Sequence, residues 1–283
     1  MDNNTVTVPW ALGGLIVAFG AAVGLGLLVH RLEVRRELID GREGRLVSDG
    51  MGGAVGFLGG AAAFLLGVLM LASTDHYYAT RNVVDAEAVA YAAAFNSSGD
   101  LADPDQARIQ RDLGCLMRSV GTDSWEAAAA EQLAGATNTQ MWRARLRDSV
   151  TAVEPKTAAQ SNSLDKLQSE LLEASKSGQQ RLLDADSDLP FVLWILFYVS
   201  IFLLVFVITL MLRPYPMMAA SALGTILILS LAMVWVLTAF AKPFTQDDSV
   251  YISPRAINGV MAHLQQVYPG AAWAPCERLA PTT

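Results

Sequence analysis

Acidic residues form two short clusters, and these are the side chains in the chain best suited to binding a cation. Asp184-Ala-Asp-Ser-Asp188 has the spacing that begins a calcium loop, but the glycine and the glutamate that complete such a loop are missing. Asp247 and Asp248 form the second cluster. A solvated acidic face is the favoured interpretation of both. We therefore predict no obligate cofactor, with Asp247 and Asp248 as ligands for a divalent cation such as calcium if one binds.

The sequence contains few signs of a metal site or a catalytic site beyond these acidic clusters. His30, His76 and His263 are scattered, and none has the spacing of a zinc site. The sequence contains no phosphate-binding loop, nucleophile elbow or HExxH motif. We predict that the protein is not an enzyme.

Four long apolar runs contain no Asp, Glu, Lys or Arg, and each is long enough to cross a bilayer, which takes roughly 20 helical residues. They are Pro9–Val29, Met51–Ser73, Pro190–Leu212 and Pro216–Ala241. Pumps, ion-coupled transporters and intramembrane proteases usually place ionisable or nucleophilic groups at membrane depth. The empty runs therefore favour a passive pore or a scaffold in a cell membrane.

The polar stretch between the second and third runs is long enough for a small domain, and its patterning is helical. Asp103-Pro-Asp-Gln106 has the form of a capping box with proline at the first helical position. One apolar face follows, formed by Ile109, Leu113, Leu116, Met117 and Val120. The sequence predicts an all-α membrane protein with four spans and a helical insert, divided into segments 1–73, 74–189, 190–241 and 242–283.

Small residues recur at close-packing spacing in the first two runs. Their members are Gly20, Gly24, Gly52, Gly56 and Gly60. Such stripes let helix backbones approach closely in lipid. They predict tight pairing of runs one and two, or of run two with its copy in a homo-oligomer. The third run is bulky on all sides and is expected to face lipid.

Phe57 and Phe64 lie one heptad apart on the second run, beside its glycines. They are candidates for the neck of a pore that gates by dewetting. Ordinary packing is the alternative.

Arginines predict the orientation. Arg31, Arg35, Arg36, Arg42 and Arg45 lie in the connection between the first two runs, which the positive-inside rule places in the cytoplasm. The N-terminus, the insert and the C-terminal tail are then extracytoplasmic. The net charge of -7 argues against binding nucleic acid.

The two cysteines, Cys115 in the insert and Cys276 in the tail, are separated by two spans and therefore share a side of the membrane. On the extracytoplasmic side they can form a disulfide. Two unrelated thiols are the open alternative.

The residues after the fourth run resemble a motif of an uncharacterised prokaryotic bestrophin-like membrane family. The matching positions are Lys242, Pro243, Phe244, Ile252, Ser253 and Pro254, with Lys242 where that family usually has arginine. True bestrophins are pentameric anion channels with an apolar neck on the second span and an acidic calcium clasp after the fourth. This more distant likeness implies a channel, with Asp247 and Asp248 at the clasp.

Two functions follow from these observations. The first is a bestrophin-like, oligomeric, anion-conducting channel. The second is a non-conducting structural or accessory subunit that contacts a partner protein through its insert and tail.

Overall fold

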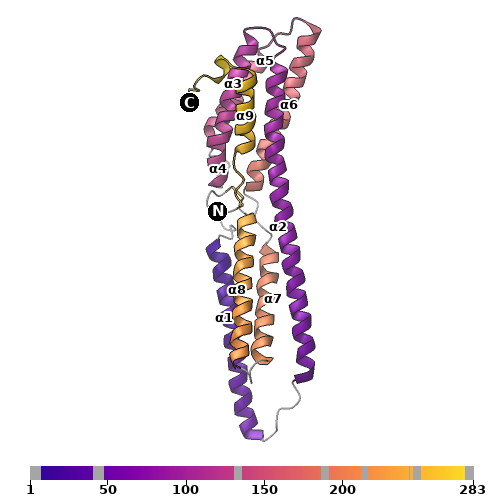
Figure 1. Ribbon diagram of the computed structural model, residues 1–283, viewed down its shortest axis with the longest axis vertical. Coiled ribbons are helices and arrows are strands. Elements are labelled where there is room, and N and C mark those ends of the chain that lie inside the picture. The colour runs from indigo at the N-terminus through magenta and orange to yellow at the C-terminus, as the bar shows by residue number, and fades with distance from the viewer. Residues whose placement is uncertain are drawn as a thin grey trace. The chain divides into compact units, whose positions relative to one another are not determined.

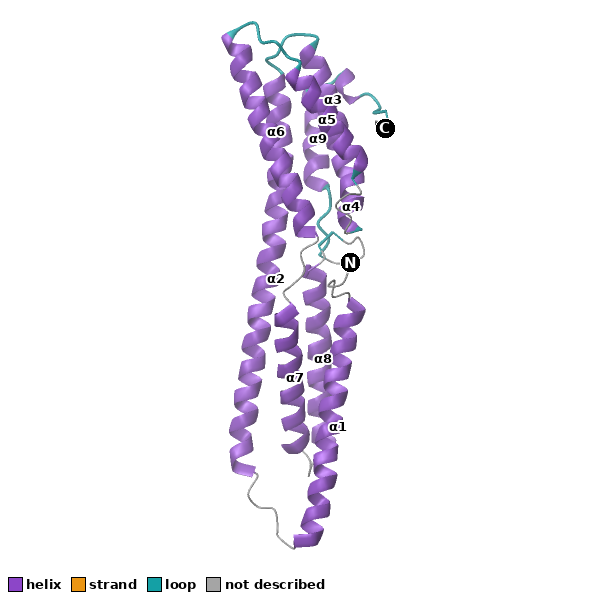
Figure 2. Ribbon diagram, turned by 180° about the vertical axis from the view of Figure 1, so that it is seen from behind, coloured by secondary structure: helices purple, strands orange, loops and turns teal. Residues whose placement is uncertain are grey.

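The computed structural model describes residues 8–40, 48–130, 136–185, 191–211, 216–241, 243–244 and 250–277 (Figure 1). These residues form helices and loops, and no strand occurs among them (Figure 2). Four of the helices are long and apolar enough to span a membrane. The predicted class, an all-α membrane protein with four candidate spans, is confirmed. The elements in order are α1 (Val8–Asp40), α2 (Ser48–Ser98), α3 (Asp105–Ser119), the π-helix η1 (Val120–Ser124), α4 (Trp125–Ala129), α5 (Thr137–Thr151), α6 (Ala158–Ala185), α7 (Phe191–Met211), α8 (Pro216–Ala241), α9 (Arg255–Val267) and the 3-10 helix η2 (Ala271–Trp273).

The chain divides into two compact units. The membrane unit comprises Met1–His76 and Asp188–Ala241, and the helical unit comprises Tyr77–Ser187 and Lys242–Thr283. The first division therefore falls within α2. Each unit combines two segments that are distant in the sequence, and each has a hydrophobic core of its own.

In the membrane unit, α1 packs mainly against α7 and less extensively against α8 (Figures 1 and 2). The expectation that the third run faces lipid does not hold for one side of α7, which is buried on α1. The buried residues of α7 recur every three or four positions and are Trp194, Phe197, Ile201 and Val205. A helix that is apolar all round gives no contrast by which the sequence could reveal its packing face.

Two glycines that were not singled out determine how closely α1 approaches α7. A Cβ added at Gly14 would lie 3.0 Å from the Tyr198 ring, and one at Gly26 would lie 2.8 Å from Thr209 Cγ2. The predicted tight pairing of runs one and two within one chain is wrong, since the extensive packing of α1 is with α7 and α8. The alternative, pairing of run two with its copy, stays a prediction.

The core of the helical unit is formed by residues from the second part of α2, the helices α3 to α6, and the tail. The five residues of the predicted apolar face, four on α3 and Val120 in η1, are at most 2% exposed, which confirms that prediction. The capping box is wrong by one position, because α3 begins at Asp105 with Pro104 at the N-cap and no side-chain cap bond. The tail helix α9 was not predicted, and it buries Ile257 and Leu264.

Candidate functional site

The membrane part of α2 presents an uncovered face. Phe57 is 75% exposed and Phe64 is 71% exposed. Gly56 and Gly60, on the same helix, are exposed as well, and no described atom lies within 4 Å of a Cβ added at either. Gly52 is helical, but its surroundings lie outside the described residues. The chain therefore leaves its two pore candidates and these glycines without a partner from its own described residues.

The glycines predicted on α1 have the same character. Gly20 and Gly24 are exposed, with no described atom within 4 Å of an added Cβ. They are thus distinct from Gly14 and Gly26, which contact α7.

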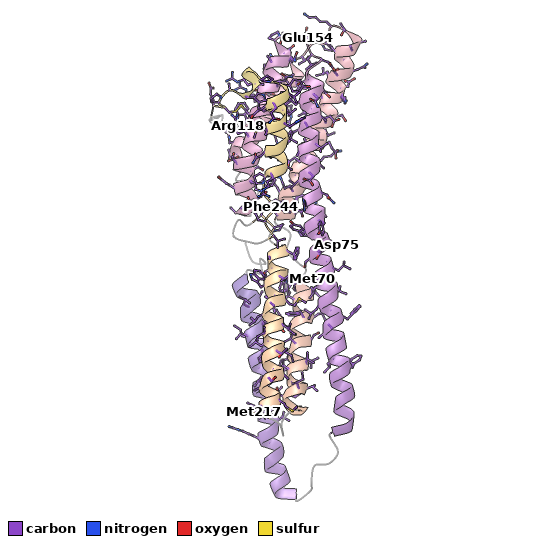
Figure 3. The ribbon with its side chains drawn as sticks, in the orientation of Figure 1. Met70, Asp75, Arg118, Glu154, Met217 and Phe244 are labelled. Atoms are coloured by element: carbon purple, nitrogen blue, oxygen red, sulfur yellow. A yellow bond between two sulfur atoms is a disulfide. The ribbon has the colours of Figure 1, made fainter. Side chains whose placement is uncertain are left out.

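The described residues of the family motif after α8 pack within the helical unit. Phe244, labelled in Figure 3, is 2% exposed and packs edge-on against the Trp125 ring at 5.8 Å. The Ile252 amide donates a hydrogen bond to the Pro243 carbonyl at 2.7 Å. Trp125 Nε1 donates to the Ile252 carbonyl at 3.0 Å. The motif is thereby fixed to Trp125.

The remaining motif residues either precede the tail helix α9 or lie outside the described residues. Ser253 is partly exposed, and Pro254 is at the N-cap of α9. Lys242, Asp247 and Asp248 lie outside the described residues. Among the residues that are described, no group of three or more metal-ligating side chains could hold an ion. Calcium binding by the two aspartates therefore stays a prediction.

A disulfide joins Cys115 on α3 to Cys276 in the tail, with the two Cα atoms 5.6 Å apart. Arg118, one turn along α3, reinforces this attachment (Figure 3). Its Nη1 lies 3.0 Å from Cys276 Sγ and 3.4 Å from the Ala274 carbonyl. Gly114 leaves space for the tail backbone, since a Cβ there would lie 2.9 Å from the Ala272 carbonyl oxygen. The tail is thus covalently part of the helical unit.

A charged cluster lies in the core of the helical unit. Glu87 on α2 and Arg181 on α6 are both 0% exposed, and Arg181 Nε donates to Glu87 Oε2 at 2.8 Å. Arg181 Nη2 donates to Ser124 Oγ at 3.0 Å, and its guanidinium lies 4.4 Å from the centre of the Trp125 ring. Trp125 therefore contacts both this cluster and the family motif.

Arg143 on α5 gives the cluster one more positive than negative charge. Its Nη2 is 3.7 Å from Glu87 Oε1, which is an ion pair without a hydrogen bond. Four buried atoms of the cluster have no hydrogen-bond partner in the described structure: Glu87 Oε1, Arg143 Nε, Arg143 Nη2 and Arg181 Nη1. Such atoms are costly to bury, so each calls for a partner.

Tyr91, one turn beyond Glu87 on α2, lies beside this cluster. Burial, helped by the Glu87 carboxylate and opposed by Arg143, raises the pKa of Tyr91 to about 12. The hydroxyl is therefore a neutral donor near neutral pH.

A second buried carboxylate in the same unit is fully paired. Asp112 on α3 is 1% exposed, accepts a hydrogen bond from Ser149 Oγ at 2.6 Å and lies 3.2 Å from Arg145 Nε. The comparison shows that this unit can satisfy a buried charge completely. The unpartnered atoms around Glu87 and Arg143 are therefore a local feature of that cluster.

The charged cluster was missed by sequence reasoning, although one signal for it exists. The core positions of α6 follow a spacing of three and four residues along Leu164, Leu167, Leu171, Ala174, Gly178 and Arg181. A glycine and an arginine continue an apolar series there. An arginine at a core position requires a buried acidic partner, which the sequence alone does not identify.

Together these features define a four-span membrane protein whose helical unit holds its C-terminal tail by a disulfide and a buried tryptophan. Residues 16–257 match the Bestrophin-like domain, so the chain belongs to the bestrophin-like family. Comparison with curated proteins and with solved structures finds no match.

Proposed function

We propose that this protein is the protomer of a homo-oligomeric, anion-conducting channel lined by α2. Family membership supports a channel class. The observation that carries the proposal is the uncovered face of α2, with Phe57 and Phe64 exposed beside glycines that have no partner in the described protomer.

In a membrane, the uncovered face of α2 contacts either lipid or another helix. Glycines offer lipid little contact surface but allow helices to approach closely, so a glycine-lined face favours a second helix. Phe57 and Phe64 are seven residues apart, which is about two turns and places them on one side of α2. Closed rotational symmetry would repeat both rings around an axis. Rings of phenylalanine then form an apolar constriction that conducts only when wetted.

The proposed orientation places the helical unit outside the cytoplasm. The arginines between the first two spans favour the cytoplasm for that connection. The Cys115–Cys276 disulfide supports the same orientation, because such bonds persist in oxidising compartments.

The experiment uses full-length protein reconstituted in liposomes, after native mass spectrometry has established its oligomeric state. We expect a closed oligomer with chloride flux, and we expect Phe57→Ala and Phe64→Ala to raise the flux several-fold by widening the neck. Phe191→Ala is the matched control, because Phe191 is 64% exposed on α7, outside the proposed pore. It should leave flux unchanged.

Two outcomes would contradict the proposal. An intact oligomer that passes no ions would favour the alternative, a non-conducting accessory subunit. If Phe191→Ala and Phe57→Ala changed the flux equally, the change would come from losing any lipid-facing ring and not from widening the pore neck.

A further inference from the structure

We propose that the helical unit binds an amphiphilic anion, with one anionic head and a short apolar body, between α5 and α6. This site is separate from the proposed pore and does not rest on conduction. Two adjoining hollows and the basic pair Arg143 and Arg147, which lines both of them without any acidic neighbour among the described lining residues, carry the inference.

The first hollow has a volume of about 360 Å³, within the size range of small-molecule sites. Its apolar wall comes from three helices and consists of Leu116, Leu146, Val150, Leu171 and Leu172. Tyr91 also lines it and offers a neutral hydroxyl. The wall can enclose a short hydrocarbon or aromatic group.

The second hollow, about 540 Å³, adjoins the first along α5. Arg143, Arg147 and Ser175 line both hollows. Arg143 and Arg147 are four residues apart, so their side chains neighbour each other on one face of α5. No Asp or Glu is among the described residues that line either hollow.

The charge of the cluster favours an anion over a cation or a neutral ligand. Arg181 and Glu87 neutralise each other through their 2.8 Å bond, and this leaves the Arg143 charge only weakly paired at 3.7 Å. The Arg143 side chain is 20% exposed and lines both hollows beside Arg147. Arginine binds carboxylates and phosphates through its guanidinium donors. A head group at Arg143 and Arg147 places the body of the ligand against the leucines.

The test is calorimetric titration of the full-length protein in nanodiscs, with empty nanodiscs titrated to subtract partitioning into lipid. The probe is 4-phenylbutyrate, and 4-phenylbutan-1-ol and 4-phenylbutylamine are its neutral and cationic counterparts. Acetate tests the head alone. We expect saturable binding of phenylbutyrate, with the alcohol, the amine and acetate each at least about tenfold weaker.

Two variants locate the site without removing a member of the buried cluster. Arg147→Gln removes one exposed charge and should weaken phenylbutyrate binding about tenfold. Ser175→Phe should fill the space between the hollows and abolish binding. Arg255→Gln is the matched control, since Arg255 is an exposed arginine on α9 that lines neither hollow. Amide hydrogen exchange of α5 and α6 at the wild-type level, together with an intact Cys115–Cys276 bond, verifies that each variant is folded.

Equal binding of the alcohol or tighter binding of the amine would overturn the proposal. Unchanged binding in Arg147→Gln or in Ser175→Phe would do the same. Acetate binding as tightly as phenylbutyrate would show a bare anion site and refute the amphiphile.

Discussion

The membrane unit and the helical unit bury their cores by different means. Among the residues of the membrane unit whose burial is described, the buried side chains are apolar apart from hydroxyls such as those of Ser73 and Thr238, which bond to their own helix. The helical unit buries Glu87, Asp112 and Arg181 and adds a disulfide. Lipid supplies no hydrophobic drive between spans, so close packing joins them, and the Tyr198 hydroxyl of α7 adds a hydrogen bond to the Ala11 carbonyl of α1 at 2.9 Å. In the helical unit, ion pairs of buried carboxylates join α2 to α6 and α3 to α5.

The largest expected effect is on the buried ion pair. Arg181→Met leaves the Glu87 carboxylate buried with only Arg143 nearby, and we expect the helical unit to lose about 3–5 kcal/mol of stability. Amide hydrogen exchange of α2 and α6, in the full chain in nanodiscs, measures this loss while the membrane unit stays protected.

The matched control is Lys176→Met on the same helix. Lys176 and Glu173 form a surface ion pair whose side chains are 63% and 59% exposed. Removing this ion pair should change the stability measured by amide exchange by less than about 0.5 kcal/mol. Similar losses in both variants would contradict the prediction that the buried ion pair, rather than any ion pair on α6, stabilises the helical unit.

The disulfide is the next largest contribution. The double variant Cys115→Ser, Cys276→Ser should lower the stability of the helical unit by about 2–4 kcal/mol, because the bond restricts the unfolded chain. Loss of exchange protection should concentrate in α3 and α9. Reduction of the wild-type protein provides the control, and unchanged protection in both cases would contradict the prediction.

Gly178 tests how tightly the charged cluster is enclosed. A Cβ at this position would lie 2.5 Å from Arg143 Nη2 and 2.6 Å from Glu87 Oε1, so Gly178→Ala should cost about 1–3 kcal/mol. Gly259→Ala is the matched helical control, with no described atom within 4 Å of the added Cβ. It should be neutral or stabilising by up to about 1 kcal/mol. Amide hydrogen exchange, measured at a series of temperatures, compares the stabilities of the two variants. Equal changes in stability would contradict close packing at Gly178.

The smallest effect is expected in the membrane unit. Gly26→Ala places a Cβ 2.8 Å from Thr209 Cγ2 and should weaken α1–α7 packing by about 1 kcal/mol. Gly24→Ala, with no described atom near its added Cβ, should leave protomer stability unchanged. The stabilities are compared by denaturation in mixed micelles, with the protein diluted until it is monomeric. A larger loss of stability for Gly24→Ala than for Gly26→Ala would contradict the α1–α7 interface.

The same contrast explains how much the sequence could predict. The four spans and the apolar face of α3 follow from local composition and from helical periodicity. The Arg181–Glu87 pair joins residues 94 positions apart, so no local pattern identifies it. The choice of Gly14 and Gly26, rather than Gly20 and Gly24, depends on the partner helix α7, which a glycine spacing does not name. The calcium and pore predictions at Asp247, Asp248, Phe57 and Phe64 stay predictions.

The disulfide also constrains how the spans are inserted while the protein is being made. The chain between Cys115 and Cys276 contains both α7 and α8, so the covalent ring includes two membrane spans. The bond therefore requires that α7 and α8 either both cross the membrane or both stay out of it, because only then do α3 and the tail lie on one side. A chain that stalls with one span inserted keeps its thiols apart. The ratio of bonded to free cysteine in newly made chains thus reports how often one of the two spans inserts without the other.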